Sequence, residues 1–136
     1  MRIVLDTNVL ISGIITPFEN AARVLDMIVL GEIQIVYDDR VLAEYREVLQ
    51  RPKFGFGINV IYEFLAFIES EGFKVTAIPI NEEMIDKDDV PFVEAAITGL
   101  ADVLITGNKR HFKGKATRQI KIMTPDEFLK FWTKRS

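Results

Sequence analysis

The sequence predicts an α/β protein: one domain over residues 1–136, with a parallel sheet of about four to five strands sandwiched between α-helices. Short apolar runs, typical of strands buried on both faces, alternate with longer stretches whose apolar residues recur at helical spacing. The length of 136 residues and the hydrophobic content of 49% suit one domain with a substantial core. The first apolar run, Arg2–Leu5, ends directly on an acid, Asp6.

The first half of the chain is predicted to hold two strands and three helices. Glycines at 31 and 72 follow two of the helical stretches, where glycine commonly ends a helix. Asp38 or Asp39 can cap another helix, which Pro52 prevents from continuing far. In order, we expect a strand at Arg2–Leu5, a mixed loop containing Pro17, a helix at Asn20–Leu30, a strand at Ile33–Tyr37, and helices at Arg40–Gln50 and Ile58–Glu71.

The second half continues the alternation. The last helix carries the clearest start signal, with Thr124 as its cap, Pro125 at its first position and Glu127 three residues after the cap. The elements expected before it are a strand at Phe73–Ile78, a helix at Phe92–Thr98 closed by Gly99, and strands at Asp102–Thr106 and Gln119–Met123.

Composition excludes several classes of function. The chain has no cysteine, which removes disulfides, thiolate metal sites and thiol nucleophiles. Its net charge of -3 argues against a globally basic surface for nucleic acids, although a local one is compatible with it. No apolar stretch is long enough to cross a bilayer, and the amino end does not resemble a signal peptide. We therefore expect a cytoplasmic protein that does not enter membranes.

Acidic residues follow the predicted strands or begin the helices after them. Because the carboxyl ends of parallel strands meet at one edge of a sheet, several of these groups should converge there. Clustered carboxylates repel one another unless a divalent cation neutralises them, and oxygen-only ligands suit Mg²⁺ or Mn²⁺. The candidates are Asp6, Glu44, Asp86, Asp88, Asp89 and the strand exit Thr106–Asn108.

Each acid also has a structural interpretation. Asp6 could cap the next helical turn, Glu44 could be a solvated helix residue, and the acids at 86–89 could be first-turn acids stabilised by the helix dipole. Asp102 begins a strand, so we expect it to have a structural role at the opposite edge. His111, the one histidine, lies in a basic loop, where contact with a phosphate or solvent is favoured over contact with a metal.

Several of these segments together resemble the PIN domain ribonucleases, and especially the VapC-like toxins of toxin-antitoxin pairs. The resemblance runs nearly end to end. It is carried by Ile3–Leu10, by Glu44 within Val41–Leu49, and by Arg51–Phe54, Asp86–Phe92, Ala101–Asn108 and Thr124–Leu129.

The resemblance implies a metal-dependent endoribonuclease that hydrolyses RNA phosphodiester bonds. Asp6, Glu44 and Asp89 would be the metal-binding acids, holding one or two Mg²⁺ or Mn²⁺ ions, and Asn108 would complete the catalytic set. Thr7 or Asn8 would orient the Asp6 side chain by a hydrogen bond, as residues next to metal ligands commonly do. Weaker supporting candidates are Ser12, Asp88 and Thr106.

Asn108 departs from the family pattern, because many relatives carry a further Asp at that point. An amide can still coordinate a hard cation, but it adds no charge. We therefore expect one tight metal site and one weak one. The alternative is a catalytically weak or silent PIN-domain module that binds RNA or a protein. An aspartate-nucleophile phosphatase is disfavoured, since that class needs a second acid where this chain has Asn8.

The expected partners are RNA, a small antitoxin protein and further copies of the chain, as a dimer or higher homo-oligomer. An apolar groove near the second and third predicted helices, with Ile61, Phe64 and Phe67, could accept the antitoxin. The stretch Phe54–Gly57 could pack against a partner or stack a base. Basic residues near the expected rim could position RNA phosphates without reading sequence, namely Arg51, Lys53, Lys109, Arg110 and Lys113.

Overall fold

The computed structural model describes residues 1–81, 86–114 and 116–135, which form a five-stranded parallel sheet and six α-helices. The sheet order is β3-β2-β1-β4-β5, and every neighbouring pair is parallel. The predicted α/β class is therefore confirmed. The strands are β1 (Arg2–Leu5), β2 (Gln34–Tyr37), β3 (Phe73–Lys74), β4 (Val103–Ile105) and β5 (Lys121–Met123).

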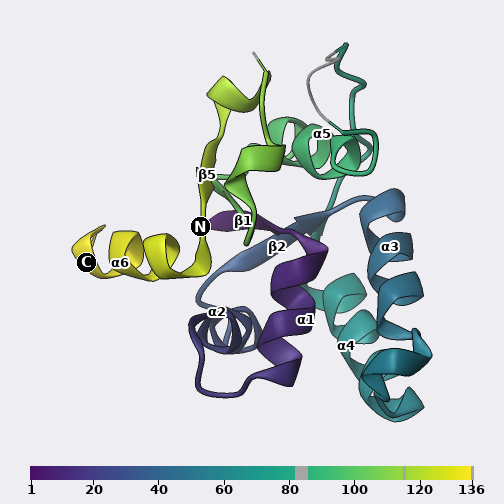
Figure 1. Cartoon of the computed structure of the whole chain (residues 1–136). Coiled ribbons are helices and arrows are strands. Elements are labelled where there is room, and N and C mark those ends of the chain that lie inside the picture. The colour runs from purple at the N-terminus through teal and green to yellow at the C-terminus, as the bar shows by residue number, and fades with distance from the viewer. Residues whose placement is uncertain (82–85, 115, 136) are drawn as a thin grey trace.

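The helices lie on both sides of this sheet. Figure 1 shows α5 on one side, and α1, α2, α3 and α4 on the other, with α6 projecting beside β5. Their bounds are α1 (Thr7–Ile15), α2 (Asn20–Val29), α3 (Asp39–Leu49), α4 (Ile58–Glu71), α5 (Val90–Thr98) and α6 (Pro125–Arg135). No helix in the described part of the chain combines the length and apolar character needed to span a membrane.

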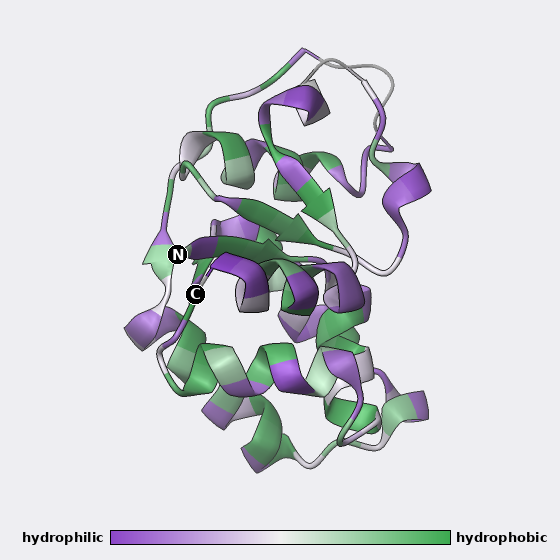
Figure 2. Cartoon of the chain, turned by 90° about the vertical axis from the view of Figure 1, so that its left-hand side faces the viewer, coloured by the Kyte–Doolittle hydropathy of each residue, from purple (hydrophilic) through white to green (hydrophobic). Residues whose placement is uncertain are grey.

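The core sits against the central strands. Ile3, Val4 and Leu5 of β1 are completely buried, and so is every residue of β4. Figure 2 shows the apolar residues concentrated on the strands and on parts of the helices, with polar residues spread over the outer turns. Burial on both faces explains why these strands read as continuous apolar runs.

The helix α1 corrects the loop expected after Asp6. Its β-branched residues have low helix propensity, but burial of Val9 and Leu10 outweighs that preference. Gly13 lets α1 approach α2 closely, because a Cβ there would lie 2.6 Å from Leu25 Cδ1 and 2.9 Å from the Ala21 carbonyl oxygen.

The strands expected at 73–78 and 119–123 are shorter in the structure. Of the strand predicted at 73–78, only Phe73–Lys74 forms strand β3 beside β2, and the last backbone hydrogen bond to β2 is from the Val75 N–H to the Tyr37 carbonyl at 2.9 Å. Ala116–Gln119 forms a short 3₁₀ helix, so β5 begins at Lys121. The helix predicted at 92–98 starts at Val90.

The strand order creates the crevice in which the candidate site lies. From β1 the chain proceeds outward through β2 to β3, whereas β4 returns to the other side of β1 and leads to β5. Ligands of open α/β sheets bind at such a reversal, outside the carboxyl ends of the strands. Here that position lies between the end of β1, at Asp6, and the end of β4, at Thr106.

Candidate active site

Asp6 lies in the crevice between β1 and β4. Its backbone N–H donates to the Ile105 carbonyl at 2.9 Å, and its side chain is oriented by the Thr106 hydroxyl, which donates to Oδ2 at 2.7 Å. The side chain makes no capping hydrogen bond to α1. Burial raises the pKa of Asp6, which is 9% exposed, and the Thr106 hydrogen bond opposes that rise. The Asp6 carboxylate is therefore aimed at the crevice edge.

Glu44 approaches the same edge from α3. The Thr7 hydroxyl donates to Glu44 Oε2, and the buried Tyr45 hydroxyl donates to the Leu5 carbonyl oxygen, which ties α3 to the end of β1. Burial raises the pKa of Glu44, the hydrogen bond from Thr7 opposes the rise, and the charge of Asp6 adds to it. The Thr7 hydroxyl therefore supports Glu44, while Asp6 receives hydrogen bonds from the Thr106 hydroxyl and from the backbone N–H of Thr7.

The third acid, Asp89, immediately precedes α5. Burial, followed by repulsion from Asp6 and Asp86, raises its pKa from 3.8 to about 6, while the charge of His111 opposes the shift. Glu44 adds a further repulsive contribution. The acids at 6, 44 and 89 thus lie within one electrostatic neighbourhood.

The donor chemistry of these three acids fits a hard divalent cation, because carboxylate oxygens are the ligands it prefers and its charge would offset the cost of burying ionised acids. Among the described residues, however, no group of three or more His, Cys, Asp or Glu side chains is already arranged to hold an ion. Side-chain rotation would have to bring the carboxylates together. Asp88 is exposed, and its backbone N–H donates to Asp86 Oδ1 at 3.0 Å.

Asn108 and His111 form the opposite wall. The Asn108 backbone N–H donates to the Thr106 hydroxyl oxygen at 3.0 Å, and Asn108 Nδ2 lies 3.0 Å from His111 Nε2. His111 Nδ1 lies 3.9 Å from Asp89 Oδ2, and its side chain is 59% exposed. The histidine therefore faces solvent, yet it also links Asn108 to an acid of the site.

Comparison with known proteins identifies the family of this chain. The family model described as the PIN domain matches residues 2–110. The chain belongs to the PIN domain family. A search of curated protein sequences finds no match.

Solved structures share the fold of this PIN domain at low sequence identity. The VapBC-1 structure from nontypeable Haemophilus influenzae is 17% identical with a TM-score of 0.58, covering 93% of this chain and 99% of that one. VapBC2 from Rickettsia felis, bound to a DNA fragment from its promoter, is 18% identical with a TM-score of 0.56, covering 90% and 97%. FitAcB from Neisseria gonorrhoeae is 18% identical with a TM-score of 0.54, covering 90% and 97%.

The remaining sequence candidates divide between the site and more distant surfaces. Asn8 Oδ1 accepts the Gly107 N–H at 3.4 Å beside the acids, and Ser12 is exposed one turn further along α1. Lys109 begins the short 3₁₀ helix after Asn108 and pairs with Glu127 at 3.1 Å. Arg110 is exposed on that same helix.

The other basic candidates lie away from these walls. Arg51 and Lys53 follow the carboxyl end of α3, whereas Glu44 lies in the middle of that helix. Arg51 pairs with Glu47 at 3.1 Å. Lys113 is exposed beyond the 3₁₀ helix that holds Lys109. The RNA-phosphate role of these basic residues therefore stays a prediction.

Sequence reasoning missed an ion-pair network in which the half-exposed Arg40 joins two buried acids. Arg40 bridges Asp38 Oδ2 at 2.7 Å and Glu94 Oε1 at 2.8 Å, and Glu94 Oε2 accepts the Ile80 N–H at 2.7 Å. Asp38 also caps α3 by accepting the Val41 N–H at 2.9 Å. The available signal was an acid inside the apolar stretch of α5, since a buried Glu requires partners. This network holds α5, and with it Asp89, against α3.

Proposed function

We propose that this PIN domain is a metal-dependent endoribonuclease and the toxin of a toxin-antitoxin pair. The proposal rests above all on the three acids at the topological reversal of the sheet. Burial raises the pKa values of Asp6, Glu44 and Asp89, and repulsion by neighbouring carboxylates adds to the rise at Glu44 and Asp89. Acids with perturbed pKa values that lie together in a crevice are typical of functional sites.

The chain's own residues can be assigned steps in RNA hydrolysis. Thr106 and Thr7 each donate a side-chain hydrogen bond to one carboxylate oxygen, of Asp6 and of Glu44 respectively. Together with Asp89, these acids would hold Mg²⁺ or Mn²⁺, which when bound supplies positive charge for the phosphate and lowers the pKa of an attacking water. Asn108, on the opposite wall, holds the His111 ring at the mouth of the site.

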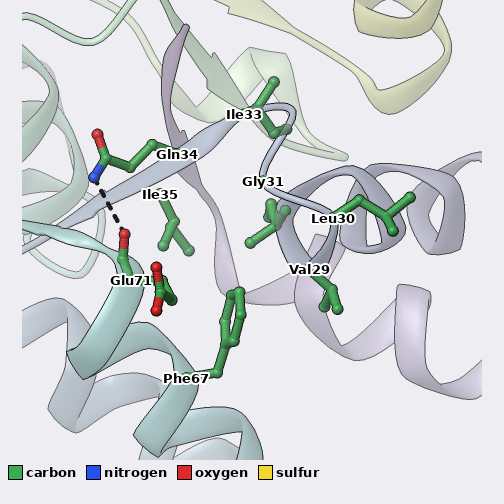
Figure 3. Close-up of a pocket in the computed structure, with 9 residues that line it drawn as sticks. Val29, Leu30, Gly31, Ile33, Gln34, Ile35, Phe67 and Glu71 are labelled. Atoms are coloured by element: carbon green, nitrogen blue, oxygen red, sulfur yellow. Dashed lines mark hydrogen bonds between the residues drawn. The ribbon is translucent and has the colours of Figure 1, made fainter.

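The proposed antitoxin partner is supported by the complexes to which the fold is similar, since two of these are VapBC structures. The surface that we propose for it is a cavity of about 580 Å³ between the end of α2, the start of β2 and α4. Figure 3 shows Phe67 and the exposed Val29 and Leu30 around this cavity. The cavity lies at the amino end of the strands, away from the acids.

The proposed antitoxin cavity differs from the apolar groove that the sequence suggested near the second and third predicted helices. Of the three residues suggested there, Phe67 lines the cavity, whereas Ile61 is buried in the core and Phe64 is half-buried against it. The carboxyl end of α2, rather than α3, lines the side of the cavity that faces Phe67.

The test is cleavage of a mixed single-stranded and structured RNA pool with Mn²⁺, Mg²⁺ or EDTA. We expect metal-dependent cleavage that Asp6→Asn abolishes. Asp102→Asn is the matched control, because Asp102 accepts the Arg2 N–H at the opposite edge of the sheet. Loss of cleavage in both variants, or cleavage that persists in EDTA, would contradict the proposal. A folded protein that binds RNA without cutting it under any metal would support the silent binding module instead.

A further inference from the structure

The only histidine of the chain, His111, ends the short 3₁₀ helix Lys109–His111 that follows Asn108. The His111 backbone N–H donates to the Asn108 carbonyl oxygen at 3.2 Å. In a 3₁₀ turn the side chains of residues three apart lie on the same side, so the Asn108 amide and the His111 ring meet. The next residue, Phe112, is 6% exposed and packs in the core. The place of the ring is therefore set by its own turn and by the anchored residue after it.

The contact with Asn108 determines which ring nitrogen of His111 carries the proton. Asn108 Nδ2 lies 3.0 Å from His111 Nε2, and an amide nitrogen can only donate a hydrogen bond. Nε2 therefore accepts, and in the neutral ring the proton is on Nδ1. The Asn108 amide thus makes Nδ1 a hydrogen-bond donor at the mouth of the site.

The Nδ1 donor of His111 lies beside the candidate acids. It is 3.9 Å from Asp89 Oδ2, which is too long for a hydrogen bond. Burial is the main influence on the pKa values of Asp6 and Asp89, but a charge on His111 opposes the rise at both, so the ring is within electrostatic reach of both acids. The side chain is 59% exposed, and a ligand that enters from solvent can reach it.

We propose that His111 binds the RNA phosphate that is cut, by donating a hydrogen bond from Nδ1 to one of its non-bridging oxygens. The inference rests on the proposed ribonuclease function and adds a residue that contacts the substrate. A phosphate held beside the Asp89 carboxylate comes to the edge of the ring that carries the proton, and its anionic oxygens are strong acceptors. A donor that is oriented before the substrate arrives stabilises developing negative charge most effectively.

The same geometry gives Asn108 a role other than holding a metal. An ionised aspartate at this position could only accept a hydrogen bond, which would place the ring proton on Nε2. The amide instead leaves Nε2 unprotonated and the proton on Nδ1. A protonated Nδ1 cannot ligate a cation, since a metal-binding imidazole nitrogen must be unprotonated. The Asn108–His111 pair is therefore suited to a phosphate oxygen rather than to a metal ion.

The first test reads the tautomer directly, because the NMR signals of the one histidine ring need no assignment. Long-range ¹H–¹⁵N spectra of the full chain are recorded at pH 8, where an imidazole is ordinarily neutral. We expect the proton on Nδ1 in wild type and loss of this preference in Asn108→Ala. Inorganic phosphate added in the presence of Mg²⁺ should shift the Nδ1 resonance, whereas potassium chloride at the same ionic strength should not.

The second test uses three substitutions of His111 that separate the two ring nitrogens. The amide nitrogen of asparagine is as many bonds from Cα as Nδ1 is, and that of glutamine as many as Nε2. We expect His111→Ala and His111→Gln to lower kcat/KM for Mn²⁺-dependent RNA cleavage by about 10-fold to 150-fold, the usual effect of losing a hydrogen bond to a charged group. His111→Asn should retain most of the wild-type activity. Because the ring is largely exposed, all three variants should unfold at the same urea concentration as wild type.

The inference is overturned if wild type cuts RNA and His111→Ala cuts it equally fast, a result that leaves the nuclease intact. It is also overturned if the ring proton is on Nε2, if phosphate does not shift Nδ1, or if His111→Gln retains activity and His111→Asn does not. A loss of activity in His111→Ala that is matched by a loss of stability would make the role structural and would overturn it too. If wild type cuts no RNA with any metal, the proposed function itself fails, and this inference fails with it.

Discussion

Burial and neighbouring acids disfavour the ionised form of Asp89 in the metal-free protein. Replacing Asp89 with Asn, a neutral side chain of the same shape, should therefore stabilise the fold. The pKa of Asp89 is raised from 3.8 to about 6. A shift of that size corresponds to at most about 3 kcal/mol, at roughly 1.4 kcal/mol for each pH unit. Because the side chain is 16% exposed and solvent screens part of the repulsion, we expect Asp89→Asn to raise the free energy of unfolding by about 1–3 kcal/mol at pH 8 in EDTA.

The pH dependence has a defined sign. Between pH 3.8 and about 6 the folded protein binds the Asp89 proton more tightly than the unfolded chain does. The wild-type contribution from Asp89 is therefore present at low pH and is lost as pH rises through about 6. The difference between Asp89→Asn and wild type should be near zero below pH 3.8 and fully developed above pH 6.

The assay is urea unfolding of both proteins in EDTA from pH 3.5 to 8, repeated with Mn²⁺. Asp88→Asn is the control, because this neighbouring acid is exposed and should change stability by less than about 0.5 kcal/mol. With Mn²⁺, wild type should gain more stability than Asp89→Asn, because a ligand stabilises the state that binds it. The reasoning is refuted if Asp89→Asn is no more stable than wild type at pH 8, or if Asp88→Asn is stabilised equally.

Three further predictions follow from individual contacts. Thr106→Val removes the donor to the Asp6 carboxylate, so the pKa of Asp6 should rise, the acid limb of the kcat/KM profile should move to higher pH, and activity should fall about 10-fold to 100-fold. Gly13→Val places a Cβ 2.6 Å from Leu25 Cδ1, and urea unfolding should show a loss of about 1–3 kcal/mol. Glu94→Ala removes a buried acceptor of a guanidinium and of a backbone N–H, and thermal and urea unfolding should show a loss of about 1–3 kcal/mol while the Asp6 pKa stays unchanged.

Much of the fold could be predicted because periodicity and capping are local properties. The helix predicted at Ile58–Glu71 has those bounds in the structure, and the Thr124–Glu127 capping box forms with both of its hydrogen bonds, at 2.9 and 3.2 Å. The helix α1 was missed because its β-branched residues disfavour helix locally, and only packing against α2 supplies the compensation. The length of β3 depended on how far the chain pairs with β2, which no local pattern records.

The candidate site was predictable in outline and not in detail. Parallel strands place their carboxyl ends at one edge, so a sequence with Asp6 after one strand and Thr106 after another indicates where the crevice lies. The partners of each side chain depend on loop conformations. The bond from Thr7 to Glu44 and the link from His111 to Asn108 therefore required the structure. The Asp102 interpretation is confirmed, since its carboxylate accepts the Arg2 N–H at the edge opposite the acids.

The hydrogen bond from Thr106 to Asp6 joins residues that are 100 positions apart, and β1 needs β4 as its neighbour on that side. During synthesis, Asp6 leaves the ribosome long before its partner strand exists. Contacts of such wide sequence separation form late, after the intervening chain is available. In the nascent chain, Asp6 therefore lacks the Thr106 hydrogen bond and the β4 neighbour that complete the site. The proposed toxin would be inactive against the ribosome and the mRNA that produce it until translation of the domain is nearly finished.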